Sequence, residues 1–235
     1  MFPGVKIRIF TIVLVVLTIP LLMNAQNGDG KYARLNNLHL YYEIHGSGEP
    51  LVLLHGGGST INSTFGRILP ELAKKHLVIA VELQAHGRTK DIDRPLSFEQ
   101  DADDIAALLT HLKIDKANVM GFSNGGTTTL QIAIRHPQLV RKIILASALF
   151  QRPGMQPGFF EGMKQASFDQ MPQPLKDAFL EVNPDKQQLT QMFNRDVKRM
   201  NTFRDIPDSS IRSIKAPALV LNGNNEVVLA AHAFI

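Results

Sequence analysis

A serine flanked by glycines is the part of this sequence best suited to covalent chemistry. Gly121, Ser123 and Gly125 hold the fixed positions of a G-x-S-x-G pattern, between a strand-like run at 118–120 and a helix-like run at 127–135. This order is typical of a nucleophile elbow, a sharp turn that lifts the serine hydroxyl above the end of a sheet. Such a hydroxyl attacks a carbonyl carbon once a base takes its proton. We therefore predict that Ser123 is a nucleophile.

Acyl transfer by a serine also needs donors for the negative oxygen of the tetrahedral intermediate. The amide of Asn124, directly after the nucleophile, is expected to supply one donor. A continuous apolar run at 51–54 leads into His55-Gly-Gly-Gly-Ser59, a glycine run whose amides can turn toward a ligand. We expect Gly57 to supply the second donor, with Gly58 as the alternative. The ring of His55 is expected to order this loop.

Three motifs in this order resemble the α/β-hydrolase family. In that family the third strand leads into an H-G-G turn and the fifth into G-x-S-x-G. The fourth leads into a D-x-x-G-H-G-x-S-like loop, where this chain carries Glu82, Ala85 and Thr89 in place of Asp, Gly and Ser. The resemblance covers roughly residues 31–235. It implies an α/β fold, with a mostly parallel central sheet, flanking helices and a helical cap, and a cofactor-free serine hydrolase.

The resemblance also implies an acid and a histidine after the seventh strand. The acid belongs to a G-D-x-D segment, and here Glu226 holds the functional position in Gly-Asn-Asn-Glu. The histidine belongs to a G-H turn after an eighth strand, which none of the eight histidines of this chain occupies. His86 is expected to be structural or to face substrate, and His232 to lie in the first turns of a further helix, directed away from the elbow. We therefore expect a C-terminally truncated hydrolase that lacks its last strand, last helix and general base, and whose activity is impaired.

Three functions remain open at this point. The first is hydrolysis of a carboxylic ester or similar acyl compound through acyl-Ser123. The second is a perhydrolase, because G-F-S-x-G-G is similar to the elbow of cofactor-free haloperoxidases. The third is a non-catalytic, ligand-binding pseudo-hydrolase. A metal enzyme is disfavoured because the H-x-H-x-D and H-E-x-x-H spacings are missing from the sequence. Dinucleotide binding is disfavoured because no G-x-G-x-x-G follows the first strand, and we expect neither cofactor nor metal.

The elements that must position these residues follow from local patterns. Residues 32–44 alternate around Asn36-Asn37 and predict a β-hairpin. Ser97 begins a capping-box pattern for a helix with an apolar face. The acids in its first turns suit the helix dipole, and we expect them on a solvated face: Asp101, Asp103 and Asp104. Further strands at 142–147 and 218–222 alternate with helices, which indicates a parallel sheet.

A change of composition marks an insertion at residues 150–213. This stretch holds five of the eight methionines and seven of the thirteen phenylalanines. Within 186–201 the apolar residues fall on one helical face: Leu189, Met192, Phe193, Val197 and Met200. The resemblance implies a helical cap here, between core segments 31–149 and 214–235. Its apolar side could form an adaptable roof over a small apolar substrate, or simply dock the helices.

Length and composition indicate one folded domain. The chain has 235 residues, with 44% hydrophobic and 20% charged residues, and no cysteine for a disulfide framework. The net charge is +4, and without residues 1–25 it is 23 basic minus 21 acidic residues, or +2. No basic stripe with interleaved aromatic residues is present, which argues against nucleic acid as a partner. The sequence does not specify an oligomeric state.

The N-terminus has the pattern of a bacterial secretion signal. Lys6 and Arg8 precede a 15-residue apolar run at 9–23. A membrane span needs about 20 residues, so we expect a signal peptide of residues 1–25, cut after Ala25. Met23 is larger than the residue preferred three places before the cut, and an uncleaved anchor is the alternative. Either reading predicts a secreted or periplasmic protein.

Overall fold

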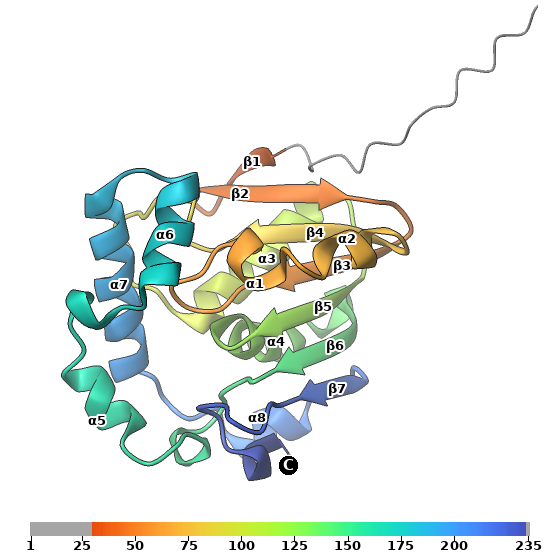
Figure 1. Cartoon of the computed structure of the whole chain (residues 1–235). Helices are drawn as coiled ribbons and strands as arrows, with labels where there is room; N and C mark the ends of the chain where they lie inside the picture. The colour runs from red at the N-terminus through yellow and green to blue at the C-terminus, as the bar shows by residue number, and fades with distance from the viewer. Residues whose placement is uncertain (1–29, 234–235) are drawn as a thin grey trace, which may run out of the picture.

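One mixed sheet forms the centre of the protein. The computed structural model describes residues 30–233, so the expected signal peptide lies outside the described residues. Within them seven strands pair in the order β1-β2-β4-β3-β5-β6-β7 (Figure 1). The strands are β1 Gly30–Leu35, β2 Leu38–His45, β3 Glu49–Leu54, β4 His76–Glu82, β5 Ala117–Phe122, β6 Val140–Ala146 and β7 Ala218–Leu221. β2 pairs antiparallel with β1 and β4, and the strands from β4 to β7 are parallel, which confirms the mostly parallel sheet.

The expected hairpin is formed by β1 and β2. Leu35 pairs with Leu38, and the two turn residues between them have positive φ, 48° at Asn36 and 66° at Asn37. Two successive residues at positive φ match the right-handed twist of the strands, and asparagine tolerates this conformation better than most residues. The Asn-Asn pair therefore fixes the register of the hairpin.

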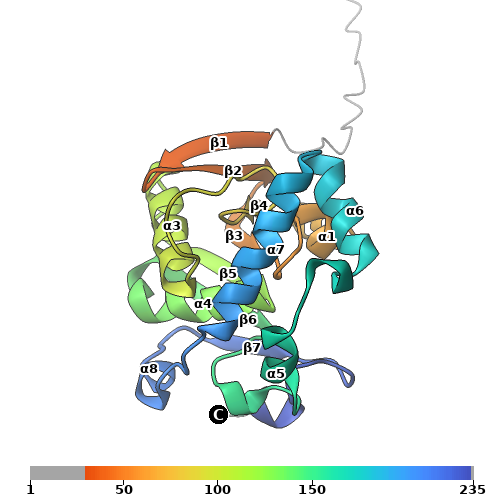
Figure 2. The ribbon, with the colours of Figure 1, turned by 90° about the vertical axis from the view of Figure 1, so that its left-hand side faces the viewer.

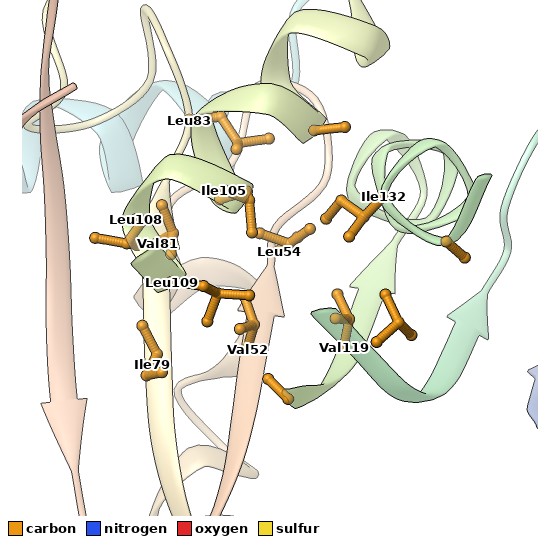
Figure 3. Close-up of a cluster of buried hydrophobic side chains, with 14 of the residues drawn as sticks. Val52, Leu54, Ile79, Val81, Leu83, Ile105, Leu108, Leu109, Val119 and Ile132 are labelled. Carbon is orange, nitrogen blue, oxygen red and sulfur yellow. The ribbon is translucent and has the colours of Figure 1, made fainter. Parts of the chain in front are cut away.

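Alternation along the buried strands divides the core between the two faces of the sheet. Val52, Leu54, Ile79 and Val81 pack on one face, against α3 Phe98–His111 and α4 Asn124–Arg135 (Figure 3). The intervening residues pack on the opposite face, against α1 Ile61–Phe65 and α2 Leu69–Ala73. Because successive side chains of a strand point to opposite faces, an unbroken apolar run buries both.

The start of α3 differs from the sequence-based expectation in two ways. Ser97 caps the helix by accepting from the amide of Gln100 at 3.1 Å, but the Gln100 side chain bonds to Asp104, so half of the capping box forms. The expectation of a solvated position is wrong for two of the three acids, since the exposed fraction is 2% for Asp101 and 1% for Asp104. Each pairs with an arginine, Asp104 with Arg94 and Asp101 with Arg199. The cations lie elsewhere in the chain, so they neutralise carboxylates that the local pattern placed in water.

The insertion between β6 and β7 forms the expected helical cap. It contains η2 Arg152–Gly154, α5 Phe159–Lys164, η3 Phe168–Gln170, α6 Gln173–Val182 and α7 Lys186–Asn201. α7 has the bounds that its apolar periodicity predicts, and Leu189, Met192 and Met200 are buried. Figures 1 and 2 show α5, α6 and α7 beside the ends toward which the parallel strands point. The last segment of the expected insertion, α8 Asp208–Arg212, packs through Ile211 on the main core instead.

The sheet ends at β7, the least buried of its strands. Leu219, Val220 and Leu221 are 54%, 43% and 43% exposed, and β6 is the one strand paired with β7 in the part of the chain described. A cavity of about 210 Å³ lies against it, lined in part by Phe150 and His232. Over residues 30–233, no helix combines the length and the apolar character that a membrane span requires.

Candidate active site

Ser123 lies on a strained turn between β5 and α4. Its φ and ψ are 53° and −118°, a conformation that a residue with a side chain rarely adopts. A Cβ on Gly121 would lie 2.0 Å from the carbonyl oxygen of Gly125, and one on Gly125 would lie 2.1 Å from that of Leu54. The main chain is therefore too close at both positions for any other residue. This geometry is that of the expected elbow.

The elbow leaves the serine accessible and places it at a helix N-terminus. The Ser123 side chain is partly exposed, and within residues 30–233 its hydroxyl has no hydrogen-bond partner. Its backbone is fixed, because its amide donates to Ala146 at 2.8 Å and its carbonyl accepts from Thr127 at 3.1 Å. The first amides of α4, beginning with Asn124, have no partner inside the helix and carry its positive dipole. They suit a developing anion next to Ser123.

The glycine loop that follows β3 lies directly against this elbow. A Cβ on Gly56 would lie 3.4 Å from the Cβ of Ser123, and one on Gly57 would lie 2.5 Å from Nδ2 of Asn124. The amide of Gly58 is already used, since it donates to Oδ2 of Asp196 at 2.8 Å. This leaves Gly57 as the better candidate for the second oxyanion donor, and its role stays a prediction.

His55 has the ordering role expected of it. Its Nδ1 donates to the carbonyl of Gly56 at 2.8 Å, and its Nε2 accepts from the amide of Leu83 at 3.1 Å. Burial and the nearby charge of His86 lower the pKa of His55 to about 3. The neutral ring thus ties the glycine loop to the end of β4, and both of its nitrogens are occupied.

Glu82, which stands where the family has Asp, is buried and structural. It accepts from the amide of Arg88 at 2.6 Å and from its Nη1 at 2.8 Å. Burial raises the pKa of Glu82 against the opposing effect of Arg88. Thr89 donates its hydroxyl to the Glu82 carbonyl at 2.6 Å, and Ala85 adopts a φ of 69° where the family has Gly. The three departures from the family pattern are therefore accommodated by the loop.

Glu226, the candidate acid, lies in the loop after β7. The amide of Ser147 donates to the Leu221 carbonyl at 2.9 Å, so β7 ends beside β6 at the edge of the sheet that carries Ser123. The Glu226 side chain approaches Gly223, whose Cβ would lie 3.1 Å from Cγ. Its carboxylate has no ion-pair or hydrogen-bond partner among residues 30–233. Its assignment as the triad acid stays a prediction.

None of the eight histidines, all within the described range, hydrogen-bonds to Ser123. His86 bonds to Gln84 and Asp196. His232, in the short helix η4 Ala230–Ala233, stacks on Phe150 with ring centroids 3.7 Å apart. Its Nε2 accepts from the Phe150 amide at 3.3 Å, and burial lowers the pKa of its ring. His232 thus faces Phe150 at the start of the insertion, and its direction relative to the elbow stays a prediction.

The sequence interpretation missed Asp196, a cap residue that reaches the site. It is 9% exposed and accepts hydrogen bonds from the amide of Gly58 at 2.8 Å and from His86 Nε2 at 2.9 Å. A signal was present in the sequence, because Asp196 stands four residues after Met192 and four before Met200, inside the apolar stripe of α7. A charge on the buried face of a helix implies a partner on the surface that it covers.

The cap covers the glycine loop with apolar side chains. Cε of Met171 and Cδ1 of Leu175 lie 3.5 and 3.6 Å from the position of a Cβ on Gly58. Met171 belongs to a buried cluster in which cap residues pack on the segment after β4: Ala85, Leu96, Met171, Phe179, Leu189 and Met192. The glycine loop that lies against Ser123 is therefore covered by apolar side chains of the cap. Residues 30–233 contain no group of three potential metal ligands.

Comparison with known proteins agrees with this geometry. The human protein named serine hydrolase BPHL is 26% identical over 204 residues, covering 82% of this chain and 68% of that protein. The 2-hydroxymuconate semialdehyde hydrolase of Pseudomonas sp. strain CF600 is 34% identical over 103 residues, covering 43% of this chain and 36% of that enzyme. The matched stretches thus span between about a third and two thirds of these relatives' lengths.

A solved structure shares the fold. CarC, a serine hydrolase involved in carbazole degradation, superposes with a TM-score of 0.72 at 21% identity, covering 87% of this chain and 83% of that one. The family model described as alpha/beta hydrolase fold matches residues 49–218, most of the chain. This protein therefore belongs to the alpha/beta hydrolase fold family.

Proposed function

We propose that this protein is a serine hydrolase that cleaves a carboxylic ester or similar acyl compound through an acyl-Ser123 intermediate. The observation that carries the proposal is the conformation of Ser123, with φ of 53° and ψ of −118° at the N-terminus of α4. A strained serine at this point presents its hydroxyl and a set of free amides to the same volume. The human and Pseudomonas relatives are named as hydrolases, which supports the reaction class.

The reaction follows from this arrangement. The Ser123 oxygen forms a bond to the carbonyl carbon of the substrate while its proton passes to water or hydroxide, since no described histidine bonds to Ser123. The carbonyl oxygen becomes an anion that the amides of Asn124 and Gly57 stabilise. The intermediate collapses to the acyl-enzyme and expels the alcohol, which takes up the proton. Water then attacks the acyl-enzyme by the same route, releasing the acid and restoring Ser123.

Among the described residues, no histidine is placed to take the proton of Ser123. Each ring nearest the loop has its nitrogens occupied, those of His55 by Gly56 and Leu83 and those of His86 by Gln84 and Asp196. A serine without a base retains only the acceleration from binding and the oxyanion donors. We therefore propose that the described histidines support only slow turnover of esters. The same observation favours the second candidate, a ligand-binding pseudo-hydrolase in which the elbow is inherited structure.

The apolar cap supports a substrate class. Met171 and Leu175 lie over the glycine loop, and long, unbranched methionine side chains adapt to irregular shapes. We propose an apolar acyl compound of small to medium size as the substrate. Secretion through residues 1–25 likewise stays a proposal.

Covalent labelling with a fluorophosphonate separates the two candidates. A hydrolase forms one adduct, mapped by mass spectrometry to Ser123 and lost in Ser123→Ala. Because ionised serine must form without a base, we expect the labelling rate to rise about tenfold per pH unit between pH 6 and 9. A plateau above pH 7 would show that a histidine acts as base after all. Wild-type protein that forms no adduct would favour the pseudo-hydrolase.

A further inference from the structure

A buried carboxylate from the cap contacts the backbone of the glycine loop. Oδ2 of Asp196, on α7, accepts from the amide of Gly58 at 2.8 Å. A Cβ on Gly57 would lie 3.0 Å from the same oxygen and 2.5 Å from Nδ2 of Asn124. The loop that offers the expected oxyanion donor is thus held between the elbow on one side and a cap residue on the other. Figure 2 shows α7 crossing in front of the strand ends.

The contacts of His86 favour its charged form. Its Nδ1 lies 2.9 Å from the carbonyl oxygen of Gln84, and its Nε2 lies 2.9 Å from Oδ2 of Asp196. Both partners can accept a hydrogen bond, so the two contacts together favour a ring with a proton on each nitrogen. The Gly58 amide lies 3.2 Å from Nε2, farther than the 2.8 Å to Oδ2 of Asp196. The Gly58 amide therefore donates to Asp196, which bridges the loop and the ring.

Arg199 completes a buried charge network with Asp101, Asp196 and His86. Its Nη2 lies 2.5 Å from Oδ1 of Asp196, and its Nη1 lies 2.8 Å from Oδ2 of Asp101 on α3. All four residues are less than 10% exposed. Two acids thus alternate with two cations, and every member has an opposite charge beside it. Arg199 and His86 hold the Asp196 carboxylate in one direction. The Gly58 amide of the loop donates to this carboxylate.

We propose that Asp196 is a positioning residue of the active site, through which docking of α7 holds the Gly56–Gly58 loop so that the Gly57 amide faces the reacting carbonyl. In its catalytic part the inference rests on the proposed function. In its structural part it does not, because the contact between cap and loop exists whatever the reaction. Docking of the cap and formation of the oxyanion site then become one event.

A second ion pair between α7 and the core provides a matched control. Arg195 pairs with Asp91 at 2.7 Å and donates to the carbonyls of Ile92 and Arg94. This pair anchors the same helix to the segment after β4 and makes no contact with the glycine loop. Asp91→Asn and Asp196→Asn each remove one carboxylate that holds α7. They differ in whether that carboxylate also touches the loop.

Two measurements on the full chain test the inference. The first is hydrogen–deuterium exchange, by mass spectrometry, of peptides covering 55–60 and 186–201. We expect Asp196→Asn to speed exchange of the loop peptide at least tenfold, and Asp91→Asn to speed exchange of α7 alone. The second is the rate of fluorophosphonate labelling at Ser123, which should fall at least tenfold in Asp196→Asn and change less than twofold in Asp91→Asn.

The results that would contradict the positioning role of Asp196 differ from those that would contradict the proposed function. Equal loop exchange in wild type and Asp196→Asn, or equal effects of the two variants on the loop, would overturn the inference. Faster labelling in Asp196→Asn would also overturn it, by showing that the carboxylate blocks the site. If Ser123 labels in no protein, the proposed function fails while the exchange result still decides the positioning role.

If Asp196→Asn does not fold, pH provides the same test on the wild type. The groups facing His86 are Asp196 and Arg199 from α7, Asp101 from α3 and His55 from the loop. Burial opposes the charged ring, but Asp196 outweighs it and raises the pKa of His86. Loop protection, corrected for intrinsic exchange, should therefore persist at the ordinary histidine pKa of about 6.5 and fall only at a higher pH, where His86 loses its proton. Loop protection that is already lost at or below pH 6.5 would overturn the inference.

Discussion

Replacing Arg199 by methionine tests the buried charge network through its effect on stability. Methionine keeps most of the side-chain volume and removes the cation between Asp101 and Asp196. The Arg199 side chain is 3% exposed, so solvent cannot replace its charge. Removing one partner of a buried pair leaves an uncompensated charge, which typically costs about 3–5 kcal/mol. The contacts of this site allow a narrower figure.

The two acids respond differently to the loss. Burial, only partly offset by Arg199, raises the pKa of Asp101 to about 6. Without Arg199, Asp101 takes up a proton in the folded variant. This protonation lowers the free energy of unfolding by about 1.4 kcal/mol, for the one unit between pKa 6 and pH 7. Asp196 keeps His86 and loses one charge-assisted hydrogen bond, worth about 2 kcal/mol. The sum predicts a loss of about 3–4 kcal/mol at pH 7.

The pH dependence has a definite sign. At pH 5 Asp101 is already protonated in folded wild type, so its share of the loss disappears. The pKa of Asp196 is lowered, because the charges of His86 and Arg199 outweigh its burial, so Asp196 stays ionised at pH 5. The loss should therefore shrink to about 2 kcal/mol at pH 5. The measurement is urea unfolding at pH 7 and pH 5, with midpoints compared at unchanged slope.

Arg135 provides the control for this prediction. It donates to Asp103 through two nitrogens, at 3.0 and 2.7 Å from Nη2 and 3.1 Å from Nε, but its side chain is 40% exposed. Arg135→Met should cost at most about 1 kcal/mol. This cost should not change between the two pH values, since the hydrogen bonds from Arg135 lower the pKa of Asp103. A loss below 1 kcal/mol for Arg199→Met at pH 7, or an equal loss at both pH values, would refute the reasoning.

Two further substitutions test the elbow and the sheet edge. Gly121→Ala places a Cβ 2.0 Å from the Gly125 carbonyl oxygen, so the substitution should lower the free energy of unfolding by about 3 kcal/mol or more and abolish labelling. Gly162→Ala, in α5, has no atom within 4 Å of the added Cβ and should be neutral or stabilising. Equal stability of the two variants in urea unfolding would contradict the crowding at the elbow. Leu219→Lys, on the edge of β7 with which no strand of residues 30–233 pairs, should reduce aggregation, followed by light scattering, with less than about 0.5 kcal/mol change in stability. Ile68→Lys, at the 41% exposed N-cap residue of α2, should leave aggregation unchanged. Equal aggregation of wild type and both variants would show that the β7 edge is not responsible.

The parts of the fold that were predictable from the sequence are those that local physics determines. Asn36-Asn37 selects its own turn, and the apolar spacing of α7 defines a helix with the bounds observed, Lys186–Asn201. The elbow around Ser123 was predictable because three fixed residues stand between a strand pattern and a helix pattern. In each case the information lies within a few residues of the feature.

The charge network was not predictable in this way because its contacts are long-range. Asp101 meets Arg199 across 98 positions, and Gly58 meets Asp196 across 138. Consecutive acids at the start of a helix satisfy the dipole rule whether or not they are buried, so the local pattern could not separate Asp101 and Asp104 from Asp103. The informative signal was Asp196 itself, a charge on an apolar stripe.

The Ser123 hydroxyl is expected to face amide hydrogens from two separate loops. A crystal structure of the phosphonylated protein would locate these donors, since the phosphonyl oxygen occupies the place of the oxyanion. Phosphorus should be bonded to Oγ of Ser123, with the phosphonyl oxygen about 2.7–3.1 Å from the amide nitrogens of Asn124 and Gly57. An adduct on another residue, or an oxygen that points away from both amides, would contradict this expectation.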